Sequence, residues 1–206
     1  MSYRSVYLTI LIALSFISLS LAFQPQTKEE LQTAVDLWVS DNATALSTYG
    51  SINSWDVSLI TDMSDLFKLK TTFNDDISNW DVSNVINMSE MFENAEAFNI
   101  NISAWDVSSV TDMEGMFYNA NEFNRDISGW DVSSVTDMRN MFEAAYSFDQ
   151  DISNWDVSNV NYMSGMFAAA DFNQDIGRWD VSSVTDMRGM FSYTAYFNQD
   201  ISNWDV

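Results

Sequence analysis

The chain has 206 residues, a formal net charge of −22, and neither histidine nor cysteine. So much negative charge excludes binding of nucleic acid or anionic lipid through a basic patch. Without histidine and cysteine the chain has no disulfides, no Ser-His or Cys-His catalytic pair and none of the commonest metal ligands, while 47% hydrophobic residues argue against disorder.

Residues 1–22 have the form of a secretory signal peptide. Arg4 precedes an apolar run over residues 8–21, and Ser20 and Ala22 place small side chains at the expected cleavage site. The run is shorter than the ~20 residues that a membrane span needs, and no second apolar segment follows. We therefore expect a secreted or cell-surface protein whose mature chain has no transmembrane helix.

Residues 23–51 are predicted to form an N-terminal cap. Thr27 and Glu30 fit a capping box, the pattern that begins many helices. A helical stripe of apolar residues follows, made of Leu31, Ala34, Val35 and Trp38. The helix is expected to cover the first unit of the repeat, because an open end would expose core side chains.

Residues 52–206 form an internal repeat of six complete units and a partial seventh. The triplet Trp-Asp-Val recurs every 25 residues, with one interval of 24, beginning at Trp55, Trp80, Trp105, Trp130, Trp155, Trp179 and Trp204. A fixed period of this length is typical of stacked units that bury their apolar faces against one another. The repeats therefore make up most of the chain.

Two periodicities divide each unit. Around Trp130 and Val132 apolar and polar residues alternate, which predicts a short strand. Met138, Met141, Phe142 and Ala145 have the spacing of a helix face, with Thr136 as its N-cap. We therefore predict an α/β repeat, a right-handed leucine-rich-repeat-like solenoid with one short parallel strand and one short helix per unit.

Five columns of apolar residues are predicted to form the core. They are the Trp and Val of each triplet, the first Met and the Phe of each Met-x-x-Met-Phe segment, and a second Phe column at residues 73, 98, 123, 148, 172 and 197. Burying one such side chain is worth roughly 1.5–3 kcal/mol, which makes disulfides unnecessary. The Met and aromatic stripes are therefore assigned to the core and not to a cofactor site.

The aspartate of the triplet is the column most able to carry chemistry. Its members are Asp56, Asp81, Asp106, Asp131, Asp156, Asp180 and Asp205. One hypothesis is that each carboxylate accepts hydrogen bonds from the serine two residues on, in an Asx-type turn. The other is that Ca²⁺ neutralises the first six of them, although no known calcium-loop motif is present. A second column, Asp76, Asp126, Asp151, Asp175 and Asp200, is assigned to turns.

The complete unit, Trp-Asp-Val-Ser-Ser-Val-Thr-Asp-Met-x-x-Met-Phe, resembles the BspA-like leucine-rich repeat of microbial surface proteins. The resemblance covers residues 52–206 and departs from the pattern at Leu66, Tyr162 and Asn101. It implies a right-handed leucine-rich-repeat-like solenoid at the cell surface, and a part in adhesion or in binding a host or matrix.

We therefore expect a non-catalytic binding or adhesion protein that recognises an extracellular protein or glycan, with no catalytic residues and no cofactor besides calcium. The alternatives are a self-assembling coat component, which associates through its C-terminal end, and a calcium-dependent adhesion module. Candidate recognition positions vary between units: Asn79, Ala104, Gly129, Asn154 and Arg178 near the predicted strand, and Glu90, Glu114, Arg139 and Arg188 on the predicted helix. Glycosylation sequons begin at Asn42, Asn87 and Asn101.

Overall fold

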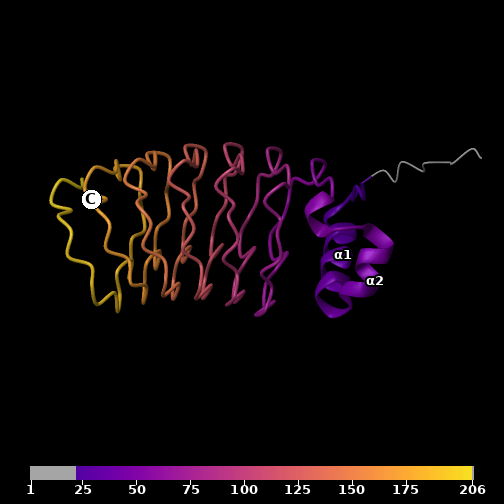
Figure 1. The fold of residues 1–206 in the computed structure, drawn as a ribbon. Helices are drawn as coiled ribbons and strands as arrows, with labels where there is room; N and C mark the ends of the chain where they lie inside the picture. The colour runs from indigo at the N-terminus through magenta and orange to yellow at the C-terminus, as the bar shows by residue number, and fades with distance from the viewer. Residues whose placement is uncertain (1–21, 206) are drawn as a thin grey trace, which may run out of the picture.

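The computed structural model describes residues 22–205, which form a helical cap followed by a stack of coils (Figure 1). The cap contains α1 (Lys28–Ser40) and α2 (Asn42–Tyr49), and the short 3-10 helix η1 (Ile52–Ser54) leads into the stack. No helix in the described part of the chain is long and apolar enough to cross a membrane.

Each coil follows the period of the sequence and lies beside the next along the stack (Figure 1). We number the complete coils one to six from the N-terminal side, as residues 55–79, 80–104, 105–129, 130–154, 155–178 and 179–203.

The predicted N-terminal helix is confirmed as α1. The Thr27 side chain accepts a hydrogen bond from the Glu30 amide at 3.2 Å, and Glu30 in turn accepts one from the Gln26 amide at 2.8 Å. These bonds satisfy amide groups that have no partner inside the helix. The predicted stripe is buried, and Trp38 packs edge-on against Trp55 with ring centres 5.8 Å apart.

Polar contacts also fix α1 over coil one. Lys28 forms an ion pair with Asp62 at 3.1 Å, and Gln32 donates to the Leu66 carbonyl at 3.1 Å. The second helix, α2, was not predicted; it begins after Asp41, whose side chain accepts from the Thr44 amide at 3.1 Å. Together the two helices close the N-terminal end of the stack (Figure 1).

The predicted α/β repeat, with a strand and a helix in every unit, is wrong. Over residues 55–205 the structure contains turns and isolated bridges but no helix and no strand. Neighbouring coils share single parallel bridges, which run through Asp62, Asn87, Asp112, Asp137, Tyr162 and Asp186. The chain is therefore a stack of turn-built coils.

Left-handed residues prevent the predicted helix. In coil four the backbone has positive φ at Asn140 (53°) and Ala144 (55°), which no right-handed helix allows. Four amides of this segment, those of Met138, Asn140, Phe142 and Ala144, donate instead to carbonyls of coil five at 2.8–2.9 Å. A chain of turns with a period near four also turns Met138, Met141 and Phe142 inward, so it produces the same apolar pattern as a helix.

Turn hydrogen bonds also replace the predicted strand. The Trp130 amide donates to the Ile127 carbonyl at 3.1 Å, and the Val135 amide donates to the Val132 carbonyl at 2.9 Å. The indole of Trp130 reaches back to the segment just before Trp105, where it donates to the Ile102 carbonyl at 3.2 Å. Neighbouring triplets are thus joined through tryptophan side chains, and no β-ladder forms there.

The predicted core columns are confirmed in coils one to five. The six tryptophans from Trp55 to Trp179 are only 2–4% exposed, and the phenylalanines of both columns are buried. Stacked rings continue from coil to coil: Phe92 and Phe117 lie 5.6 Å apart at an interplanar angle of 5°, and Phe117 and Phe123 lie 3.9 Å apart at 8°. Aromatic pairs of this kind add about 0.5–1.5 kcal/mol beyond their burial.

Candidate functional site

The aspartates of the Trp-Asp-Val triplets form local turns. In coil three, Asp106 accepts hydrogen bonds from the Ser108 hydroxyl at 2.6 Å and from the Ser108 amide at 3.1 Å. The same pair of bonds is present at Asp56, Asp81, Asp131, Asp156 and Asp180. The bonds to Ser108 lower the pKa of Asp106 because they stabilise its charged form. The Asx-turn hypothesis is confirmed for these six residues.

The second aspartate column forms turns of the same kind, as predicted. Asp126, for example, accepts from the Ser128 amide at 2.9 Å and from its hydroxyl at 2.7 Å. Calcium binding by the first column is not tested by these contacts and stays the alternative hypothesis.

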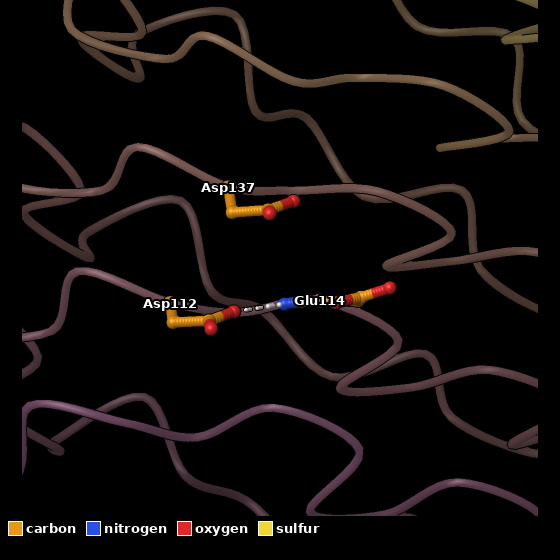
Figure 2. A group of neighbouring side chains, drawn as sticks. All are labelled: Asp112, Glu114 and Asp137. Atoms are coloured by element: carbon orange, nitrogen blue, oxygen red, sulfur yellow. Dashed lines mark hydrogen bonds between the residues drawn. The ribbon is translucent and has the colours of Figure 1, made fainter.

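A group of three acidic side chains lies elsewhere, on neighbouring coils (Figure 2). Asp112, Glu114 and Asp137 each offer a carboxylate oxygen, and these oxygens lie within 4.8 Å of one another. None of the aspartates predicted to bind calcium belongs to this group. Arg139 already contacts two of its members, Asp137 at 2.6 Å and Glu114 at 2.8 Å. The group is therefore part of an ion-pair network.

This network belongs to a longer surface that we call the charged ridge. It consists of the outward side chains around the Met-x-x-Met-Phe segments of coils one to five: Asp65, Lys68, Glu90, Glu93, Glu114, Tyr118, Asp137, Arg139, Asn140, Glu143 and Tyr162. Methionine and phenylalanine of the same segments point into the core, so the residues between them are left facing outward.

Lys68 links coils one and two on the charged ridge. Its ammonium group lies 3.3 Å from Asp65 and 2.9 Å from Glu93, and it also contacts Glu90. The hydrogen bonds to Glu90 and Glu93 raise the pKa of Lys68. Its side chain is 30% exposed, so the ion pairs are partly shielded from water.

A shallow hollow of about 130 Å³ follows on the charged ridge. Its lining comes from three successive coils and consists of Glu90, Glu93, Glu114, Gly115, Tyr118 and Asn140. Burial raises the pKa of Glu114, while Arg139 opposes that shift. The hollow thus combines carboxylates, an amide and a phenol, which suit polar or cationic groups of a partner.

Arg139 and Asn140 continue the ridge towards coil five. The guanidinium of Arg139 lies 5.5 Å from the ring centre of Tyr162, within the range of a cation–π contact. With its amide oriented to satisfy its neighbours, Asn140 donates to Glu143 at 3.0 Å and to the Ser164 carbonyl at 3.2 Å. Burial raises the pKa of Glu143.

The sequence predicted some residues of this surface but assigned them to the wrong backbone structure. Glu90, Glu114 and Arg139 were expected on a helix, whereas they lie on the turns of the charged ridge. Arg188, the fourth of these positions, pairs with Asp186 at 2.8 Å in coil six.

Other ridge residues were missed, among them Lys68, Glu93 and Tyr162. These residues follow no repeating pattern, and only their variation from unit to unit could have pointed to them. The other predicted set, Asn79, Ala104, Gly129, Asn154 and Arg178, precedes the tryptophans and is exposed.

Fold and surface define a class of protein: a repeat protein of stacked coils with a helical cap and a variable ridge along one side. The chain belongs to the family described as "Mycoplasma protein of unknown function, DUF285", whose model matches residues 36–144 and 121–206. No curated protein and no solved structure matches the chain. The family agrees with the repeat organisation found in the sequence.

Proposed function

We propose that this protein is a non-catalytic binding or adhesion protein, similar to BspA-like surface proteins, which recognises an extracellular partner through the charged ridge. The observation that carries this proposal is the contrast between the two sides of each Met-x-x-Met-Phe segment. The inward side repeats almost unchanged, while the outward side changes from Lys68 to Glu93, Tyr118 and Glu143 at one position. A surface that varies over a constant scaffold is what recognition requires.

Binding accounts for the carboxylates better than catalysis does. The aspartates of the first column repeat in every coil and those of the second in every coil but the second, which has Asn101, and they accept hydrogen bonds within their own turns. An active site would instead need a singular group with an unsatisfied acid or base. Apart from Glu143, the acidic residues of the ridge form ion pairs with Lys68 or Arg139.

The composition of the charged ridge favours a protein partner, with a glycan as the alternative. The ridge offers charges of both signs together with Tyr118 and Tyr162, and tyrosine and arginine are enriched where proteins recognise proteins. Because the chain carries a net charge of −22, binding to a basic partner would weaken as salt is added.

We further propose that the protein acts outside the cell or on its surface. The signal peptide predicted for residues 1–22 lies, apart from Ala22, outside the described residues. Phe23, the first residue after this segment, is part of the fold. The Phe23 ring lies 4.4 Å from that of Tyr49, and the Phe23 carbonyl accepts from the Asp56 amide at 2.9 Å.

The test is binding of residues 23–206 to a panel of immobilised matrix proteins and glycans. The ridge variant carries Glu114→Ser, Arg139→Ser and Tyr162→Asp, each of which installs a residue that another coil has at the same position. The control carries Ala104→Asn and Arg178→Asn, chosen in the same way away from the ridge. We expect at least about a 10-fold loss of affinity for the ridge variant and no change for the control.

Two results would refute the proposal. One is equal binding by the ridge variant and the unchanged protein, since recognition would then use another surface. The other is the absence of binding to every protein and glycan of the panel. Enzymatic turnover of a panel glycan would point to catalysis instead.

A further inference from the structure

The three sequons for N-linked glycosylation, which begin at Asn42, Asn87 and Asn101, lie in different surroundings in the folded chain. A glycan is joined to the side-chain amide of the asparagine, at its Nδ2 atom. A folded protein can therefore carry one only where this atom reaches the solvent. The hydroxyl group two residues on belongs to the same motif, so its hydrogen bonds matter as well.

Asn101 presents its sequon at the surface. Asn101 and Ser103 are both exposed, while Ile102 between them is buried and anchors the segment in the core. The Asn101 side chain accepts a hydrogen bond through Oδ1 from the Ser103 amide at 3.0 Å, which makes an Asx turn. Within residues 22–205 neither the Asn101 Nδ2 group nor the Ser103 hydroxyl bonds to another residue. Both groups are therefore available at the surface.

The other two sequons are presented less well. Asn42 is the first residue of α2, and the Thr44 hydroxyl of its sequon already donates to Asp41 at 2.6 Å. Asn87 is half-buried and belongs to the column of parallel bridges between neighbouring coils. A glycan on Asn87 would have to emerge from between those coils. Exposure and free hydrogen-bonding groups thus single out Asn101.

The fold itself does not require asparagine at residue 101. Aspartate makes the same turn elsewhere, as where Asp126 accepts from the Ser128 amide at 2.9 Å. Repulsion between carboxylates does not explain the asparagine either, because the four successive coils from Asp126 to Asp200 all carry aspartate at this position. Compared with aspartate, asparagine adds only the Nδ2 group, which is the group that a glycan needs.

Neighbouring coils hold the backbone beside Asn101 in place. The Asn99 amide donates to Oδ1 of Asn74 at 2.9 Å, and Oδ1 of Asn99 accepts from the Asn124 amide at 3.2 Å. These bonds do not use the side chain of Asn101. The segment also contributes no residue to the charged ridge, so a glycan on Asn101 would leave the proposed recognition surface unmodified.

We propose that Asn101 is an acceptor for an N-linked glycan. The inference rests on the proposed extracellular location, because such glycans are added to chains that enter the secretory route. In the transfer a bond forms between Nδ2 of Asn101 and the anomeric carbon of the sugar. The bond from this carbon to the diphosphate of a lipid-linked oligosaccharide breaks, the diphosphate leaves with the bonding electrons, and Nδ2 loses one proton to a base of the transferring enzyme.

The test secretes residues 23–206, behind the leader peptide of a host protein, from a eukaryotic cell that glycosylates exported proteins. Enzymatic release of glycans in heavy-oxygen water marks each formerly glycosylated asparagine for mass spectrometry, and we expect the mark on Asn101. Asn101→Asp installs the residue of the adjacent coils and should abolish this modification, as should Ser103→Ala. Ser103→Thr keeps the hydroxyl and should preserve it. The matched control is Asn87→Asp, which also installs the residue of the adjacent coils and should leave Asn101 modified.

The outcomes separate this inference from the proposed location. Secreted protein without a glycan on Asn101 overturns the inference, and so does a glycan that is found on Asn87 and not on Asn101. The full chain, with its own residues 1–22, is expressed in the same cell in parallel. If it stays inside the cell, the proposed location is refuted, while the form with the host leader still decides whether Asn101 accepts a glycan.

Discussion

Gly165 offers a sharp test of the turn-built coil. Its φ of 66° is left-handed, and a Cβ atom added there would overlap the terminal amide of Asn140 in coil four. Gly165→Ala would place alanine in a conformation that costs roughly 1–2 kcal/mol. It would also displace the Asn140 amide from Glu143 and the Ser164 carbonyl, and each hydrogen bond contributes about 0.5–1.5 kcal/mol. We expect the free energy of unfolding to fall by about 2–5 kcal/mol in total.

Gly129→Ala is the matched control. Gly129 has no positive φ, and an added Cβ would meet nothing within 4 Å. Replacing a glycine in such a place restricts the unfolded chain, so the stability should stay equal or rise by up to about 1 kcal/mol. Both variants change glycine to alanine in a turn of the stack, and the two sites differ in backbone conformation and in the space available to a Cβ atom.

The measurement is urea unfolding of residues 23–206, followed by tryptophan fluorescence. With a slope near 2–3 kcal/mol per molar, Gly165→Ala should lower the midpoint by about 1 M. Circular dichroism should give the same midpoint, because stacked coils can otherwise unfold in parts. Equal midpoints for the two variants would refute the left-handed turn at Gly165, and with it the turn-built coil that depends on positive φ at such positions.

The other predictions concern the core, the turns, acid and calcium. Phe117→Ala should lower the free energy of unfolding in urea by about 3–5 kcal/mol, because it opens a cavity inside the stacked rings. Asp106→Ala should lower it by only about 1 kcal/mol, because it removes the hydrogen bonds that Asp106 accepts from Ser108. Arg188 lowers the pKa of Asp186 to about 2 through hydrogen bonds, so the stability that this pair contributes should be present above about pH 4 and lost as the pH falls towards 2; a thermal melt at each pH shows this. Millimolar calcium and a chelator should give coincident melts, because the turn serines already hold the aspartate column; a large drop on chelation would make that column a metal site.

The sequence predicted the buried residues correctly, whereas it predicted the wrong secondary structure for the segments that carry them. Trp130, Val132, Met138 and Phe142 are all in the core, as the periodicities indicated. Which residues are buried follows from the spacing of inward-facing positions along the sequence, and this spacing is nearly the same in a chain of turns as in a short helix. The error in backbone type therefore left the core assignment intact.

A signal for the turns was present in the sequence. Gly115, Gly165 and Gly189 occupy the position of Asn140, and these are the residue types that adopt positive φ most readily. Asp65 and Glu90 stand at the same position in coils one and two, which weakens the pattern. The charged ridge was harder to predict, because its contacts join residues about 25 positions apart, such as Glu114 and Arg139.

The helical cap also decides how the chain finds its register during folding. Coils two to five bury nearly identical sets of side chains against one another, so a chain displaced by one whole coil would form almost the same core. Coil one alone has partners that occur once: the Trp38 indole donates to Asp75 at 2.8 Å, and Lys70 pairs with Asp36 at 2.6 Å. These contacts can form in only one alignment, so they favour the correct register over registers displaced by a whole coil. A chain without α1 should therefore populate slipped and intertwined species, even though every coil needed for the stack is still present.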